Sequence, residues 1–188
     1  MQNSRHIRAI LSELVQNRLL PSIGELSASN APIDILAINF AYGLDFVAAF
    51  IFGLSRGTDF LRDSACRQSW LDEYRKSHPS EYMFWLLEHP RLIKLLAKLG
   101  MNVVVPTWYH KADTEFDKWG MKLLEATEKD LQAGFTEEGA KSGDMPNMYF
   151  QLKKAMADED KLEGGAYFKP NEVQKRELAS ECLDHLGK

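Results

Sequence analysis

The stretch that decides the fold is APIDILAINFAYGLDFVAAFIFGL, residues 31–54. Its apolar residues surround most of the circumference of a helix, which is typical of a helix that is buried on several sides. The stretch is also long enough to span a membrane. However, it contains Asp34, Asn39 and Asp45, and an aspartate near the middle of a span costs about 2.5–3.5 kcal/mol. We therefore expect a buried core helix here and no transmembrane helix.

The hydrophobic pattern on both sides of this stretch is helical as well. Before it, apolar residues repeat every three or four positions up to Leu19, and we expect Pro21 to end or interrupt that helix. After it, Thr58 and Asp59 are suited to cap a third helix. The one β-branched run, MNVVVP at residues 101–106, contains a proline that limits it as a strand. The sequence therefore predicts an all-α chain. Further helices are expected at residues 81–88, 90–99, 109–134, 147–156 and 171–185.

Composition excludes several classes of protein. The chain has 188 residues with 23 basic and 27 acidic side chains, a net charge of −4, so it lacks the basic excess of nucleic-acid-binding domains. Cys66 and Cys182 are far apart and form no CxxC motif, which argues against a disulfide framework or a zinc site. Both are expected on apolar, buried helix faces. The N-terminus shows no charged region followed by an apolar one, so no secretory signal is expected.

Local motifs do not identify an enzyme. Glycine-rich phosphate loops, the Gly-x-Ser-x-Gly elbow and the HExxH zinc motif are all missing from the sequence. The pattern therefore predicts no catalytic, cofactor-binding or metal-binding residue. Composition and spacing by themselves indicate only a mostly helical segment.

Six strings of the sequence nevertheless resemble, in the same order, the central part of cytochromes P-450 of the microsomal fungal type. LSELVQNRLLPSIGEL and the stretch from residue 31 to residue 63 look like that family's helices D and E. RQSWLDEYRKS looks like helix F, and residues 81–108 look like the apolar F–G connection. TEFDKWGMKLLEATEKDL is similar to helix G, and ELASECLDHL to the start of helix I.

The resemblance also shows which family elements have no counterpart. Members of the family hold haem through a cysteine in a Phe-x-x-Gly-x-Arg-x-Cys-x-Gly loop, which neither Cys66 nor Cys182 matches. Helix K with its Glu-x-x-Arg pair, the Trp and Arg of helix C, and the acid–alcohol pair of helix I also lack a counterpart. We expect residues 1–188 to be one incomplete segment of a cytochrome P-450 domain, inactive alone and without haem. Two alternatives are a free-standing helical module that binds apolar ligands or membrane surfaces, and an unrelated helical interaction domain.

By resemblance, this segment forms the roof of the substrate pocket. The intact family oxidises an apolar small molecule with O2, takes electrons from an NADPH-dependent flavin reductase, and lies on the cytoplasmic face of the endoplasmic reticulum membrane. A peripheral membrane contact is implied for the stretch from Tyr82 to Leu99. The residues expected to face the substrate are Tyr74, Phe84, Leu87 and Phe116, and those expected to face the membrane are Met83, Trp85 and Leu86.

Overall fold

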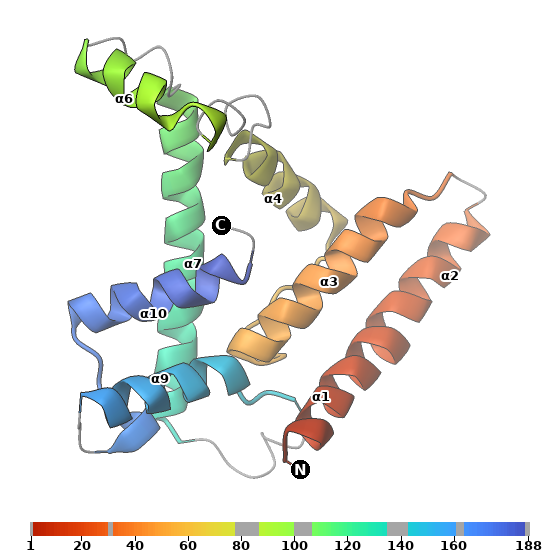
Figure 1. Cartoon of the computed structure of the whole chain (residues 1–188). Helices are drawn as coiled ribbons and strands as arrows, with labels where there is room; N and C mark the ends of the chain where they lie inside the picture. The colour runs from red at the N-terminus through yellow and green to blue at the C-terminus, as the bar shows by residue number, and fades with distance from the viewer. Residues whose placement is uncertain are drawn as a thin grey trace. The chain divides into compact units, whose positions relative to one another are not determined.

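The structure, a computed structural model, describes residues 2–29, 32–77, 87–99, 107–134, 143–160 and 164–186. All regular structure in these ranges is helical, so the expectation of an all-α chain is confirmed. The chain divides into two compact units, residues 1–64 with 120–188, and residues 65–119. The elements, labelled in Figure 1, are α1 (Gln2–Ser12), η1 (Glu13–Leu19), α2 (Leu20–Ala28), α3 (Ile35–Phe52), α4 (Ser64–Ser77), α6 (Pro90–Lys98), α7 (Thr107–Gln132), α9 (Asn147–Glu159), η3 (Gly165–Tyr167) and α10 (Glu172–Asp184).

Helix α3 forms the core of the first unit, as the sequence predicted. Asp34 caps it by accepting a hydrogen bond from the Ala37 amide at 2.9 Å. Ala41 and Ile51 are fully buried, but Leu36 on the open side is 80% exposed. By length and composition the described residues contain one helix, α3, that could cross a membrane, and 44% of its 18 residues are buried inside the structure.

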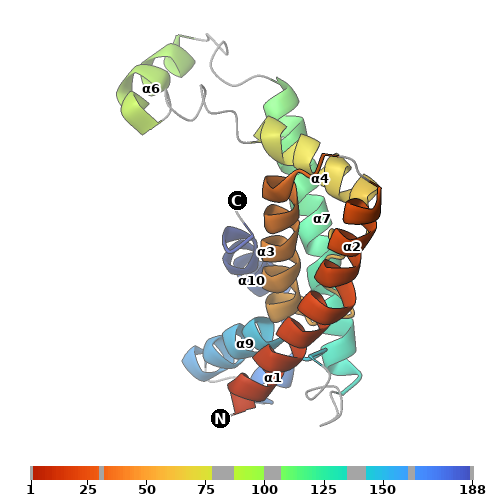
Figure 2. The ribbon, with the colours of Figure 1, turned by 90° about the vertical axis from the view of Figure 1, so that its right-hand side faces the viewer.

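Helices α1 and α2 form one continuous rod beside α3 (Figures 1 and 2). Pro21 does not end this rod, but the α-helix is interrupted just before the proline, where the rod widens into a π-helical turn, η1. The Leu20 amide bonds the carbonyl of Val15, five residues back. Pro21 has no N–H to offer the carbonyl of Asn17, and Arg62 donates to that carbonyl instead at 2.8 Å. The wide turn and Arg62 together allow the helix to pass through a proline.

The connection after α3 is organised by Asp45, whose side chain is fully buried. Its carboxylate accepts hydrogen bonds from the Thr58 hydroxyl at 2.7 Å, the Phe60 amide at 2.8 Å and the Leu61 amide at 3.0 Å. Thr58 therefore binds Asp45 and does not cap a helix. The prediction that Thr58 and Asp59 begin the third helix is wrong, because α4 starts only at Ser64.

Arg18 joins the wide turn to the same connection. Only 7% of its side chain is exposed, and its guanidinium donates to the carbonyl of Thr58 at 3.0 Å and lies 3.2 Å from Asp59. The Glu13 carboxylate lies 3.6 Å from the same group. Asp45 from α3 and Arg18 from η1 thus both hold the connection.

Gly53 allows this connection to turn back on α3. Its φ of 90° lies in the region that favours glycine, and a Cβ there would overlap the carbonyl of Asp144.

We expect Gly53→Ala to lower the free energy of unfolding by about 1–3 kcal/mol from backbone strain alone, and the overlap with Asp144 should add to this loss. Urea unfolding followed by far-UV circular dichroism measures the loss. Gly24→Ala, at a helical position with nothing within 4 Å, is the matched control and should stabilise by about 0.5–1 kcal/mol. Equal effects at the two glycines would contradict this account.

The second half of α7, α9 and α10 complete the first unit. The residues that mark two helix termini were predicted correctly. Gly134, with a φ of 91°, follows the end of α7. Asn171 caps α10 in a reciprocal arrangement with Gln174. Leu183 of α10 packs where Gly120 of α7 has no side chain, since a Cβ on Gly120 would overlap the Leu183 methyl groups. The glycine lets these two helices approach closely.

Candidate functional site

The second unit contains a cluster of four aromatic rings that joins α4 to the first part of α7. Trp70 and Tyr74 of α4 are stacked with ring centroids 5.1 Å apart. Phe116 of α7 lies 5.1 Å from Trp70 and 6.1 Å from Tyr74. Trp119 completes the cluster, 6.0 Å from Trp70 and 5.7 Å from Phe116. Two residues predicted to face a substrate, Tyr74 and Phe116, are therefore neighbours.

Burial within this aromatic cluster is uneven. Phe116 is 4% exposed and Trp70 is 8% exposed, whereas Tyr74 and Trp119 are half-buried. Trp70 lies four residues before Tyr74, and Trp119 three residues after Phe116, so each pair shares one helix face. Helical spacing could therefore have added both tryptophans to the predicted site. The rings give each other apolar contact across α4 and α7. That Tyr74 and Phe116 face a substrate remains a prediction.

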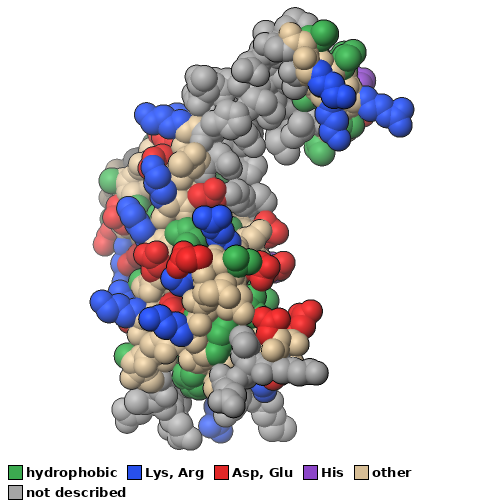
Figure 3. All heavy atoms as spheres, turned by 90° about the vertical axis from the view of Figure 1, so that its left-hand side faces the viewer, with side chains coloured by type: hydrophobic (Ala, Val, Ile, Leu, Met, Phe, Trp, Pro, Cys, Tyr) green, Lys and Arg blue, Asp and Glu red, His purple; other side chains and the backbone are tan. Residues whose placement is uncertain are grey.

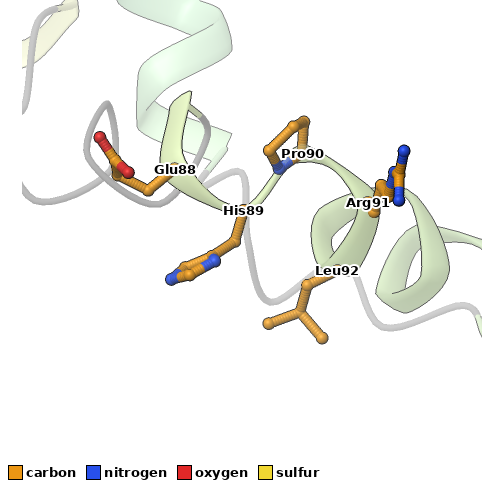
Figure 4. A pocket seen from close by; sticks show the side chains of 5 residues that line it. All are labelled: Glu88, His89, Pro90, Arg91 and Leu92. Atoms are coloured by element: carbon orange, nitrogen blue, oxygen red, sulfur yellow. The ribbon is translucent and has the colours of Figure 1, made fainter.

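The other residues predicted for the site lie at or before α6. Leu87 is 70% exposed. Phe84, Met83, Trp85 and Leu86 lie outside the described residues. Next to Leu87, a shallow hollow is lined by Glu88, His89, Pro90, Arg91 and Leu92 (Figure 4).

Glu88 and Arg91 have the spacing of a Glu-x-x-Arg pair, although no helix K was expected in this chain. In the family such a pair belongs to the interior of a helix. Here Pro90, the first residue of α6, stands between them, and the two side chains point away from each other (Figure 4). Both are exposed. This spacing therefore does not supply the missing pair.

The two cysteines lie in different surroundings. Cys182 is fully buried in α10, as the sequence predicted, and burial raises the pKa of its thiol to about 12. Cys66 is exposed, so the expectation that it is buried is wrong. The reason is that α4 begins late, at Ser64, which leaves Cys66 in its first turn.

The buried thiol predicts a loss of stability in alkali. The pKa of Cys182 is about 12 in the folded chain against an ordinary value of 9.0. The stabilising contribution of the neutral thiol is therefore fully present below pH 9.0. This contribution is lost as pH rises from there toward 12, because the unfolded chain releases the proton first. Cys182→Ala should remove this part of the pH dependence, as measured by urea unfolding between pH 7 and pH 10. An unchanged slope in the variant would refute the assignment.

The described chain contains another fully buried charge besides Asp45, and it was not foreseen from the sequence. Lys153 of α9 is fully buried, and its ammonium lies 2.8 and 2.9 Å from the two carboxylate oxygens of Glu128 of α7. The Tyr149 hydroxyl donates to the same carboxylate at 2.6 Å, and the Gln132 amide at 2.8 Å. The ammonium also lies 5.0 Å from the centroid of the Phe168 ring.

This polar cluster has the electrostatics of a structural ion pair. Burial lowers the pKa of the Lys153 ammonium more than the Glu128 carboxylate raises it. Burial and the bond to Glu128 raise the pKa of the Tyr149 phenol. Gln132 also donates to the carbonyl of Tyr167 at 3.0 Å, so the cluster links α7 and α9 to the segment before α10. Each polar group has a partner within the cluster, and we infer that the cluster stabilises the fold.

The described residues contain no group of three or more His, Cys, Asp or Glu side chains placed to hold a metal ion. Comparisons of the chain with models of protein families, with curated proteins and with solved structures find no match.

Proposed function

We propose that this chain is the central part of a cytochrome P-450 monooxygenase, in which it covers the substrate pocket. The proposal is carried by the six strings that resemble, in order, helices D to I of that family. In support, the described helices α2, α3, α4, α6, α7 and α10 each contain residues of a different string. The parent enzyme oxidises an apolar small molecule with O2 and with electrons from an NADPH-dependent flavin reductase. The chain alone is inactive.

The aromatic cluster of α4 and α7 is the part of the chain that faces the substrate under this proposal. Its rings offer mainly apolar contact, which agrees with a role in binding the substrate. The haem would supply the oxidation of the substrate, and the residues that hold it belong to other parts of the parent. The stretch from residue 82 to residue 99 makes a peripheral contact with the membrane.

Sequencing of mature transcripts beyond the Lys188 codon tests the proposal. We expect an acid–Thr motif directly after residue 188 and, further on, the Cys loop that ligates haem. A stop codon at this position in all transcripts, together with a stable soluble product, would instead favour the free-standing binding module.

A second experiment tests the inactivity of the chain itself. Haemin is added to the purified chain and reduced, carbon monoxide is admitted, and the absorption spectrum is compared with that of Cys182→Ala. We expect neither sample to show the band of a thiolate-ligated haem. A band that appears in the wild type and disappears in the variant would show that Cys182 ligates iron, and the claim of inactivity would be wrong.

A further inference from the structure

We draw no further inference here: the strongest candidate, the row of exposed leucines beside exposed basic side chains on α6 (Figure 3), belongs to the membrane contact already proposed for residues 82–99, and nothing in the structure shows what else would cover it.

Discussion

Replacing Asp45 by alanine is expected to lower the free energy of unfolding by about 3–5 kcal/mol, because the change leaves buried partners of a charged group unsatisfied. Three donors lose their acceptor: the Thr58 hydroxyl and the amides of Phe60 and Leu61. Arg18, nearby and almost fully buried, loses an opposite charge. The connection that the carboxylate organises should then exchange its amide hydrogens much faster.

Urea unfolding and hydrogen exchange of residues 53–63 measure this effect. All four tryptophans lie between residues 65 and 119, so far-UV circular dichroism is the better probe of the first unit. Asp158→Ala, an exposed aspartate in α9, is the control and should change stability by less than about 0.5 kcal/mol. A loss below about 1 kcal/mol in Asp45→Ala would show that the carboxylate does not hold the connection.

Removing one member of the buried ion pair should have an effect of similar size. We expect Lys153→Met to cost about 3–5 kcal/mol, because Glu128 then keeps a largely buried negative charge without its counterion. Glu128 is 13% exposed, and the remaining donors, Tyr149 and Gln132, do not neutralise it. The free energy of unfolding from urea titration gives the size of the loss.

Replacing both members separates the cost of an unpaired charge from the value of the pair. We expect the double variant Lys153→Met with Glu128→Met to lie within about 1–2 kcal/mol of the wild type, since buried ion pairs are often no better than apolar groups of similar volume. The pKa of Lys153 agrees with this expectation. It is lowered, because burial disfavours the charged ammonium more than the Glu128 carboxylate favours it. Strictly additive losses would mean that the two residues are not coupled energetically, which would contradict this account of the ion pair.

The elements that the sequence predicted well are those set by local signals. The apolar residues around α3, the glycine after α7 and the Asn171 cap each depend on residues within one or two helical turns. The resemblance named Tyr74 and Phe116 separately as residues that face a substrate, which stays a prediction, and it did not predict their contact. Their two tryptophan neighbours could have been added from helical spacing. Local pattern and local structure agree wherever no distant side chain intervenes.

The features that the sequence did not predict depend on partners far along the chain. Thr58 is suited to cap a helix, yet its hydroxyl donates a hydrogen bond to Asp45, 13 residues away. Pro21 is tolerated because Arg62, 45 residues after Asn17, bonds the carbonyl that a proline leaves without a donor. Lys153 looks like a surface residue until Glu128, 25 residues away, is placed beside it. Long-range polar contacts of this kind leave no periodic signal in a single sequence.

The wide turn before Pro21 has a consequence for insertions and deletions. A π turn accommodates one residue more than an α turn, so a deletion of one residue between positions 13 and 19 could close it into regular helix without breaking the rod. Because the wide turn holds the extra residue, the side chains beyond the deletion would keep nearly the same direction relative to α1. Ser22, which donates to the carbonyl of Leu61, would still face the connection. A deletion from a regular α-helical part of the rod would instead rotate every later side chain by about 100° around the axis. The rod should therefore tolerate the loss of one residue in this wide turn better than the loss of one residue from the regular helix of α1 or α2.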